Sequence, residues 1–390
     1  ALEAGARLRI TANTGGTGCG LLHSDGDLDL SKLTLDLTDR SQFILGTYTV
    51  ATCDGTLTGP FAAVTLPASY SVAYDYAGKT VRVTRGALYV SPDGDDGNGG
   101  TSWTDAKATP QAAVTAAGFG GTVLVTNGVY DTGNYENTRV LITNSVTLRS
   151  VVPRGAVIRG SGIATYGTSS AIRCVYMDSG LLDGFILEDG ATSASSKWST
   201  GGGGLAINSA SVTATNCVIR NCKALRGGGV YYGVLRDCVV SNNIAEDSGG
   251  GNDNGTRYNC LFCNNTAMYG GGVFWGYYYN CVIRDNTATR KGGGAMGNPQ
   301  YGWALYDCVI ENNTAGESGG GVYDAILTRC TVRDNTCVGN GGGVALGTYT
   351  ETLIDSNTAS NGSGGGVYQA TLYRCKVLSN VQTGSGGGGG

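Results

Sequence analysis

The sequence predicts an all-β solenoid, a right-handed parallel β-helix with about 22 residues in each coil. Gly-Gly-Gly triplets recur along the C-terminal half of the chain at steps of 21 to 27 residues. Columns of cysteine and asparagine recur with the same period, and apolar residues alternate with polar ones beside them, which is typical of short strands. The triplets begin at Gly227, Gly249, Gly270, Gly292, Gly319, Gly341, Gly364 and Gly386.

Each repeat reads as a glycine corner, a short Val-Tyr segment, a variable turn and a strand that carries a cysteine. Glycine suits a sharp corner because a Cβ atom would clash there. A coil of this length accommodates three short strands and three bends, and neighbouring coils would lie about 4.8 Å apart. The residue two positions after the cysteine is apolar in every repeat, so both positions point to the interior.

The cysteine column has two interpretations. Cysteines at one position on adjacent coils lie within the Cα range of a disulfide, but parallel side chains rarely offer the required torsion. The favoured interpretation is a buried stack of free thiols that fill space as small apolar groups. Thr352 takes the place of cysteine in one coil. The column contains Cys217, Cys238, Cys260, Cys281, Cys308, Cys330 and Cys375.

An asparagine follows the cysteine position by five residues in every repeat but the first, where Cys222 takes its place. Asparagine tolerates a left-handed backbone, and its side chain can bond the local chain at a bend. Stacked asparagines can also link their amides along the solenoid axis, so we expect a structural ladder. It would contain Asn243, Asn265, Asn286, Asn313, Asn335, Asn357 and Asn380.

Residues 88–130 are expected to open the solenoid. Thr109 is suited to cap a short alanine-rich helix that has Pro110 at its first position, and such a helix would cover the first sheet edge. This segment resembles the entrance of secreted pectate-lyase-like β-helices. Residues 131–200 would form irregular coils and residues 201–390 the regular ones.

The regular repeats, with their Gly-Gly-Gly-Val and Asn-Asn-Thr-Ala motifs, resemble those of bacterial β-helical surface proteins, including polymorphic outer-membrane and autotransporter-passenger adhesins. The resemblance implies an extracellular or cell-surface location. Residues 21–87 lack the glycine period and show alternating strands separated by turn signals, which predicts a small antiparallel β domain.

Residues 1–20 carry the repeat pattern again when they are read after the last glycines. Leu8, Ile10 and Asn13 match the cysteine, apolar and asparagine positions, and the step from Cys375 across the junction is 23 residues. We therefore expect this segment to complete a coil of a neighbouring unit, with a junction at Leu8, Ile10, Asn13, Gly386 and Gly390. Separate chains joined head to tail, or one long chain of repeated units, would both give a filament.

Two groups of residues are candidates for ligand binding. Asp93, Asp95, Asp96 and Asn98 could offer oxygens to Ca²⁺, or could form a solvated acidic turn. Aromatic residues could stack on sugar rings, or on one another between coils. They are Tyr231, Phe274, Tyr323 and Tyr368 after the triplets, with Tyr277, Tyr278, Tyr279, Tyr301 and Trp303 nearby.

Composition and charge narrow the function. A net charge of -4 without a basic stripe argues against nucleic acid, and no apolar run is long enough to span a membrane. The outward positions lack a convergent set of carboxylates, and the single histidine, His23, lies outside the solenoid. We therefore expect a non-enzymatic unit of an extracellular filament whose partners are copies of itself. The alternatives are an adhesin that binds glycans and, less favoured, a polysaccharide lyase or hydrolase.

Overall fold

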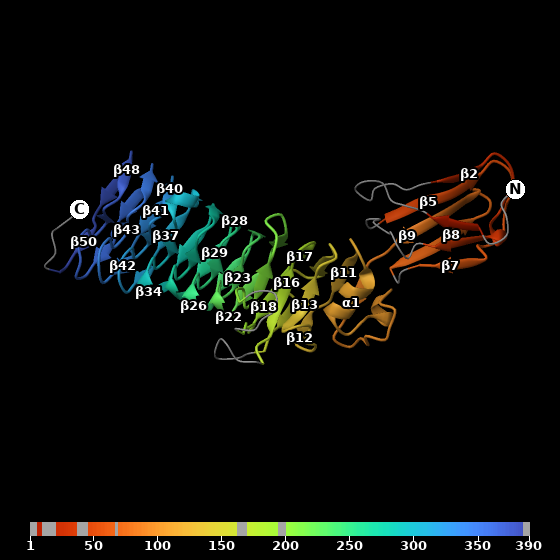
Figure 1. Ribbon diagram of the computed structural model, residues 1–390, viewed down its shortest axis with the longest axis horizontal. Coiled ribbons are helices and arrows are strands. Elements are labelled where there is room, and N and C mark those ends of the chain that lie inside the picture. The colour runs from red at the N-terminus through yellow and green to blue at the C-terminus, as the bar shows by residue number, and fades with distance from the viewer. Residues whose placement is uncertain are drawn as a thin grey trace. The chain divides into compact units, whose positions relative to one another are not determined.

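The computed structural model describes residues 6–9, 21–36, 46–66, 69–161, 170–193 and 200–384. Ile10, Asn13, Gly386 and Gly390 of the expected junction lie outside the described residues, whereas Leu8 lies in a described strand. The chain divides into two compact units. The first contains residues 1–126 and 143–151, and the second contains residues 127–142 and 152–390. The second unit holds the regular coils, which stack in chain order (Figure 1).

The first unit begins with short strands that mostly pair in parallel. Parallel pairing joins β1-β4-β7, β2-β5 and β3-β6, and antiparallel pairing joins β5-β9-β8. The strands are β1 (Ala6–Arg9), β2 (Leu22–Ser24), β3 (Leu28–Asp29), β4 (Leu33–Asp36), β5 (Gly46–Cys53), β6 (Leu57–Thr58), β7 (Ala63–Thr65), β8 (Tyr70–Asp75) and β9 (Thr80–Arg85), with a 3-10 turn η1 (Leu30–Lys32).

The expected antiparallel arrangement of residues 21–87 therefore needs a correction, since it holds for β5, β8 and β9 alone. Alternating side chains reveal a strand but not the direction of its neighbour, because both pairings place successive residues on opposite faces. Leu35, Val50, Val81 and Val83 fill the core of this region. Its first part thus repeats, on a smaller scale, the parallel stacking of a solenoid.

A short helix follows at the predicted entrance. The strands β10 (Leu88–Val90), β11 (Thr122–Val125) and β14 (Thr147–Ser150) form a parallel row, with η2 (Trp103–Asp105) before the helix α1 (Pro110–Ala117). Thr109 Oγ1 accepts a hydrogen bond from the backbone N–H of Ala112, and Pro110 needs no such partner. The helix packs on β10 and β11 through its buried face. None of the helices among the described residues has the length and apolar character needed to cross a membrane.

Four parallel sheets run along the second unit. We name them sheets I to IV, in the order in which the chain visits them after each glycine triplet. Sheet I contains β13 (Thr138–Ile142), β16 (Arg173–Met177), β19 (Leu205–Ile207), β23 (Val230–Tyr231), β27 (Asn252–Asp253), β31 (Val273–Phe274), β35 (Ala295–Met296), β39 (Val322–Tyr323), β43 (Val344–Ala345) and β47 (Val367–Tyr368). In this unit, sheet II contains β17 (Leu181–Asp183), β20 (Thr213–Thr215), β24 (Val234–Arg236), β28 (Thr256–Tyr258), β32 (Tyr277–Tyr279), β36 (Ala304–Tyr306), β40 (Ile326–Thr328), β44 (Thr348–Thr350) and β48 (Thr371–Tyr373).

Sheets III and IV complete each coil. Sheet III contains β12 (Gly128–Tyr130), β15 (Ala156–Arg159), β18 (Phe185–Glu188), β21 (Val218–Arg220), β25 (Val239–Ser241), β29 (Leu261–Cys263), β33 (Val282–Arg284), β37 (Val309–Glu311), β41 (Thr331–Arg333), β45 (Leu353–Asp355) and β49 (Lys376–Leu378). Sheet IV contains β22 (Lys223–Arg226), β26 (Ile244–Ser248), β30 (Thr266–Tyr269), β34 (Thr287–Lys291), β38 (Thr314–Ala315), β42 (Thr336–Cys337), β46 (Thr358–Ala359) and β50 (Val381–Gln382).

The regular coils thus have four short strands rather than the three that the period suggested, because the glycine triplet separates sheet IV from sheet I. Gly227 has a φ of +52°, in the left-handed region. A Cβ atom on Gly228 would lie 2.4 Å from the carbonyl oxygen of Ile244, so a side chain cannot be accommodated there. The triplet is therefore a corner that only glycine can form.

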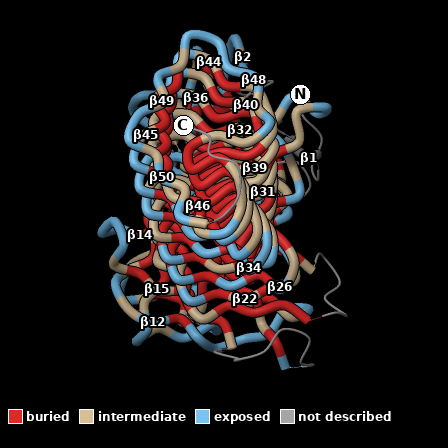
Figure 2. The backbone as a smooth tube through the Cα atoms, turned by 90° about the vertical axis from the view of Figure 1, so that its left-hand side faces the viewer, coloured by how far each residue is buried: buried red, intermediate tan, exposed pale blue. Residues whose placement is uncertain are grey.

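Buried positions run along the inside of the stacked coils (Figure 2), and most of the residues there are apolar. The cysteine column lies between sheets II and III, and its thiols donate to backbone carbonyls rather than pairing with one another. Cys217 Sγ lies 3.1 Å from the oxygen of Thr215, and Cys238 Sγ lies 3.1 Å from that of Arg236. In the described residues, every cysteine is a free thiol.

The asparagine column lies between sheets III and IV and is buried, with Asn380 only partly covered. Asn313 shows the pattern: its N–H and its Nδ2 both donate to Asn335 Oδ1 at 2.9 Å, and Nδ2 also donates to the oxygen of Ile283. The left-handed residue of this bend is Asn312, one position earlier, and not the ladder asparagine itself. The ladder thus joins successive coils through side-chain amides.

Candidate functional site

The longest step between triplets produces an outward turn. Residues 297–303 connect β35 to β36, whereas only Trp275 and Gly276 connect the corresponding strands β31 and β32. The extra residues form the 3-10 turn η3 (Pro299–Tyr301), in which Asn298 Oδ1 accepts the N–H of Gln300. Gly302 then closes the turn with a left-handed backbone. This insertion places two aromatic residues outside the regular coil.

These residues form an aromatic patch with the preceding coil, which we define as Trp275, Tyr301 and Trp303. The ring centroids of Trp275 and Trp303 lie 4.2 Å apart, and those of Tyr301 and Trp303 lie 5.5 Å apart. Tyr301 is 63% exposed, and both tryptophans are half-buried. A partly exposed indole surface beside an exposed phenol is suited to an apolar ligand face that also carries polar groups.

The backbone at Trp275 is that of the regular turn between sheets I and II. Trp275 has a φ of +57°, in the left-handed region. Tyr232, Asn254, Leu346 and Gln369 hold the equivalent position in other coils and are left-handed too. The conformation therefore belongs to the turn and does not by itself single out Trp275.

A depression of about 290 Å³ adjoins the aromatic patch. Trp303 forms part of its wall, and the other lining groups are uncharged. They are Ala210, Tyr232, Gly233, Asn254, Gly255, Thr256 and Tyr277. The depression thus combines phenol and indole rings with amide and hydroxyl groups, a composition that can both stack on a ligand and hydrogen-bond to it.

Other aromatic residues stack on one another between coils. Tyr279 lies between Tyr258 and Tyr306 on sheet II, with centroid distances of 5.0 and 5.1 Å and nearly parallel rings. Arg236 lies over the ring of Tyr258 at 4.1 Å. These rings mainly stabilise the stacking of the coils. The two interpretations of the aromatic residues, stacking on sugar rings and stacking on one another, therefore apply to different places on the solenoid.

The aromatic column proposed after the triplets is interrupted. Tyr231 pairs with Asp253 in the next coil, and Phe274 pairs with Met296. Tyr323 is followed by Ala345, and Tyr368 lies in the last described coil. Tyr278 is buried in the core, where its hydroxyl donates to the oxygen of Trp275. The structure therefore does not bring these residues together into one row.

Sequence reasoning missed Trp275, Tyr258 and Tyr306. The signal for the last two was available, because each lies two positions before a cysteine of the column, as Tyr279 does. Trp275 had no periodic partner. Its role depends on the neighbouring coil, whose insertion brings Trp303 into contact with it.

The expected calcium loop uses most of its oxygens internally. Asp96 accepts hydrogen bonds from the N–H and the hydroxyl of Thr109, and Asp95 accepts the N–H of Gly97. Asn98 Nδ2 donates to the oxygen of Ala106. Asp93 is exposed. The calcium site stays a prediction, and the observed role of the loop is to hold the start of α1.

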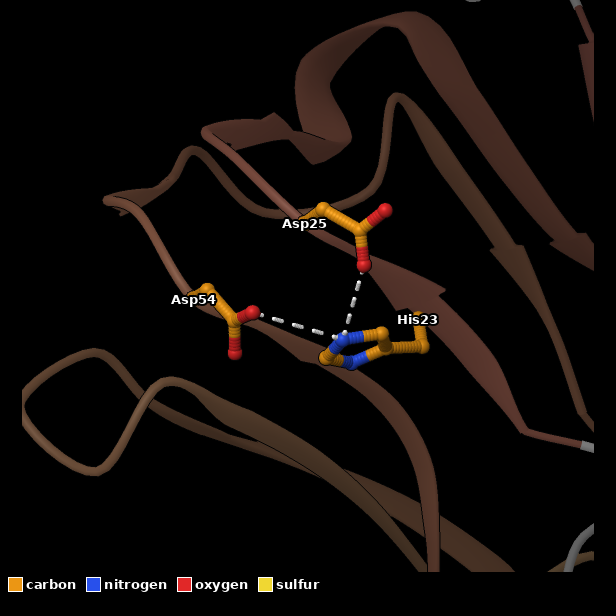
Figure 3. Close-up of side chains that lie close together, drawn as sticks. All are labelled: His23, Asp25 and Asp54. Carbon is orange, nitrogen blue, oxygen red and sulfur yellow. Dashed lines mark ion pairs between the residues drawn. The ribbon is translucent and has the colours of Figure 1, made fainter.

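A cluster that the sequence did not suggest lies in the first unit, where His23, Asp25 and Asp54 converge (Figure 3). His23 Nε2 lies 3.5 Å from Asp25 Oδ1 and 3.7 Å from Asp54 Oδ2, and its Nδ1 lies 2.8 Å from Thr52 Oγ1. One ring nitrogen and two carboxylate oxygens could hold a cation, but all three side chains are well exposed. The geometry is equally that of a solvated ion pair.

Comparison with known proteins relates this chain to others through its fold. A scan against protein families and a search of curated proteins both find no match. The solved structures that are similar include pectate lyase Pel9A, with 14% identity, 77% of this chain and 79% of that one covered, and a TM-score of 0.40. The A-module of an Azotobacter vinelandii mannuronan C-5 epimerase has 16% identity, coverage of 72% and 94%, and a TM-score of 0.37. Pectin methylesterase PemA from Erwinia chrysanthemi has 14% identity, coverage of 69% and 78%, and a TM-score of 0.34.

These similar structures correct one expectation. The absence of a convergent carboxylate set led us to expect no catalytic activity, yet the similar solved structures are a lyase, an epimerase and an esterase. The exclusion of enzymatic activity therefore does not stand. At 14–16% identity the likeness concerns the fold and assigns no activity. This chain is a right-handed parallel β-helix.

Proposed function

We propose that the chain is a β-helical surface protein that binds a polysaccharide at the aromatic patch of Trp275, Tyr301 and Trp303. The observation that carries the proposal is the inserted turn, which places Trp303 4.2 Å from Trp275 and leaves Tyr301 63% exposed. Pyranose rings have apolar faces and hydroxyl edges, and the adjoining depression offers rings, an amide and a hydroxyl. Its uncharged lining favours a neutral polysaccharide.

Affinity electrophoresis in gels that contain single polysaccharides tests this proposal. The native chain should be retarded by at least one neutral polysaccharide. One ring contact of about 0.5–1.5 kcal/mol corresponds to a loss of roughly 2- to 12-fold in affinity, so Trp303→Ala and Tyr301→Ala should each show a loss of this size. Trp103→Ala is the matched control, because Trp103 is 45% exposed and lies in η2, outside the patch.

The same panel separates binding from catalysis. Release of reducing ends or unsaturated products from a retained polysaccharide would make the aromatic patch part of a substrate site. Retention without products supports a binding protein. If no polysaccharide retards the native chain, or if the Trp103 variant loses as much affinity as the Trp303 variant, the proposal fails.

A second candidate function is that of a unit in an extracellular fibre. One observation favours it: Leu8, Ile10 and Asn13 repeat the spacing of the cysteine, apolar and asparagine positions of the regular coils, and β1, which contains Leu8, pairs in parallel with β4. Electron micrographs of the purified chain test this function directly, since a fibre should show rods that lengthen with protein concentration. Single particles at every concentration would rule it out.

A further inference from the structure

Two turns of the first unit stack on one another. Asp25 and Gly26 follow β2, and Asp54 and Gly55 follow β5, the strand with which β2 pairs in parallel. The backbone pairing continues into the turns, because the N–H of Asp54 donates to the oxygen of Ser24 at 2.9 Å. The N–H of Gly55 likewise donates to the oxygen of Gly26 at 3.1 Å. Carboxylate oxygens of Asp25 and Asp54 therefore lie within 4.8 Å of each other.

Two carboxylates of like charge repel each other when the backbone holds them this close. Among the residues that the structure describes, His23 is the ionisable side chain within ion-pair distance of both. The Nζ of Lys79 donates to the backbone oxygen of Asp54, at 2.6 Å, and not to its carboxylate. An imidazole in its neutral form offsets none of this repulsion, whereas a cation bound between the three side chains would offset it.

The separations around His23 suit ligands of one metal ion. Its Nε2 lies 3.5 Å from Asp25 Oδ1 and 3.7 Å from Asp54 Oδ2, and Figure 3 shows both carboxylates directed at this nitrogen. A hydrogen bond would bring nitrogen and oxygen to about 2.7–3.2 Å. The ligands of tetrahedral Zn²⁺, each about 2.0–2.2 Å from the ion, are about 3.2–3.6 Å apart. A small movement of the exposed Asp54 side chain therefore completes a set of three ligands.

Thr52 fixes the orientation of the imidazole. Its Oγ1 lies 2.8 Å from His23 Nδ1, and the two residues are partners in the register of β2 and β5. When Nε2 binds a cation, Nδ1 carries the ring proton and donates a hydrogen bond to this hydroxyl. Histidines that bind metals are regularly held through their second ring nitrogen in this way. The hydrogen bond therefore presents Nε2 to the two carboxylates.

From this arrangement we propose that His23, Asp25 and Asp54 bind one Zn²⁺ ion, with Nε2 and one oxygen of each carboxylate as ligands. Zinc accepts both imidazole and carboxylate, whereas Ca²⁺ and Mg²⁺ take oxygen ligands. A solvated ion pair requires neither a second carboxylate nor an anchored ring. The side chains are 45%, 100% and 67% exposed, which leaves room for water at the remaining position of the ion. The ion joins two stacked turns of the first unit, so this site is independent of the aromatic patch.

The site can be observed directly because His23 is the one histidine of the chain. In a chain labelled with ¹⁵N-histidine, every ring-nitrogen signal in the NMR spectrum belongs to His23. Titration of the metal-free, full-length chain with zinc chloride at pH 7.5 should shift the Nε2 signal and saturate at one ion per histidine. Zinc that binds to cysteines elsewhere leaves this signal unchanged, so the measurement separates the two kinds of site.

Variants of the two carboxylates test the other ligands through the same signal. Asp25→Asn and Asp54→Asn keep the size of the side chain and remove its charge. Loss of a residue that merely supports a ligand costs about 10–100-fold in metal affinity, so each of these variants should bind zinc at least about 10-fold more weakly. Asp334→Asn is the matched control, because it makes the same change at an exposed position outside the cluster and should bind as the native chain does.

Thr52 is a positioning residue, and its variants test the anchored ring. Thr52→Val keeps all three ligands and the branched shape of the side chain but removes the hydroxyl, so zinc affinity should fall about 10-fold. Thr52→Ser restores the hydroxyl and should restore most of the affinity. Circular dichroism and the unfolding temperature of each metal-free variant should match those of the native chain, which shows that the fold is kept.

The outcomes decide the proposal. A saturable shift of the Nε2 signal, with losses in both aspartate variants and none in Asp334→Asn, supports the zinc site. The proposal fails if zinc leaves the histidine signals of the native chain unchanged. It also fails if the aspartate variants bind zinc as tightly as the native chain, because the histidine then holds the ion alone. A shift of equal size and affinity with Ca²⁺ or Mg²⁺ would overturn the assignment of zinc.

Discussion

Thr352 continues the cysteine column directly after Cys330, and it makes the same hydrogen bond. The hydroxyl of Thr352 donates to the oxygen of Thr350 at 3.0 Å, and the thiol of Cys330 donates to the oxygen of Thr328 at 3.5 Å. The backbone N–H of Cys330 lies 3.4 Å from Thr352 Oγ1, as that of Cys217 lies 3.4 Å from Cys238 Sγ. The position therefore requires a small side chain that can donate to its own turn, and a disulfide would remove that donor.

The first prediction follows from this equivalence. Thr352→Cys should change the free energy of unfolding by less than about 1 kcal/mol, whereas Thr352→Val should lower it by about 1–2 kcal/mol, because the carbonyl of Thr350 then loses its donor in a buried site. Urea unfolding curves measure both values. Equal destabilisation by the two variants would show that the hydrogen bond contributes nothing at this position.

The thiols of the column should also stay reduced without protection. Each is 0–2% exposed from Cys217 to Cys330, so the native chain should react slowly with a thiol reagent and the unfolded chain rapidly. Mass spectrometry after alkylation in denaturant, with no reductant added, should show these cysteines labelled. Labelling that appears only after reduction would contradict the assignment of free thiols.

The asparagine ladder leads to a second stability prediction. Asn313→Ala removes the acceptor for two donors of Asn286, its N–H and its Nδ2, in a site that is fully buried. Each unsatisfied buried donor costs about 1–3 kcal/mol, so we expect a loss of at least about 2 kcal/mol in urea unfolding. The exposed Asn361 provides the control, and Asn361→Ala should cost less than about 0.5 kcal/mol. If both variants lost a similar free energy of unfolding, the ladder would not contribute to stability.

Glu188 should stabilise the solenoid through two arginines on adjacent coils. Its Oε1 accepts from Arg159 and its Oε2 from Arg220, at distances of 2.6–3.0 Å, and its side chain is 8% exposed. Burial alone would raise the pKa of Glu188, but the hydrogen bonds and charges of Arg220 and Arg159 outweigh it and hold this pKa below its ordinary value. The carboxylate therefore stabilises the fold above its unfolded pKa of about 4.3, and the contribution is lost as the pH falls through the lower folded value.

Glu188→Gln tests this directly. We expect a loss of about 2–3 kcal/mol at pH 7, below the roughly 3–5 kcal/mol of a fully buried pair because both arginines are partly exposed. The difference from the native chain should shrink as the pH falls below about 4. Glu351→Gln breaks an exposed pair with Arg374 and should cost less than about 1 kcal/mol. If the loss of stability in Glu188→Gln grew as the pH fell, the ionised carboxylate would not be the form that stabilises the fold.

Asp253 should show the opposite pH dependence. Burial raises the pKa of Asp253 from 3.8 to about 7, although Ser248 donates to its carboxylate and Arg226 and Arg257 lie near enough to oppose the shift. At a pH between these two pKa values, Asp253 is ionised in the unfolded chain and protonated in the folded chain. Stability that depends on this group therefore falls as the pH rises from about 4 to about 7, and is constant above that.

Asp253→Asn removes this titration and keeps an acceptor for Ser248. We expect the variant to match the native chain near pH 4 and to be more stable at pH 8, by at most about 4 kcal/mol at 1.4 kcal/mol per pKa unit. Thermal unfolding at both pH values measures this. Asp334→Asn makes the same substitution at an exposed position and serves as the matched control. A variant that is less stable than the native chain at pH 8 would mean that the carboxylate is ionised and well paired.

The sequence by itself determined the solenoid and its interior. Gly228 tolerates no Cβ, and Asn313 recurs where one amide can bond the next, so each repeat carries its own corner and its own ladder position. These features are local to one coil or repeat with the period, and a linear pattern records them. The same reasoning placed Thr109 and Pro110 at the start of α1.

Only the tertiary structure decided where side chains from different coils meet. Trp275 and Trp303 are 28 positions apart in the sequence, and their contact depends on the shape of an inserted turn that breaks the period. The parallel pairing of β1 with β4 could not be predicted either, because apolar and polar residues alternate in the same way in parallel and in antiparallel strands. His23 meets Asp54 because two strands lie side by side. Such contacts depend on the stacking of coils and strands in space, which no single repeat encodes.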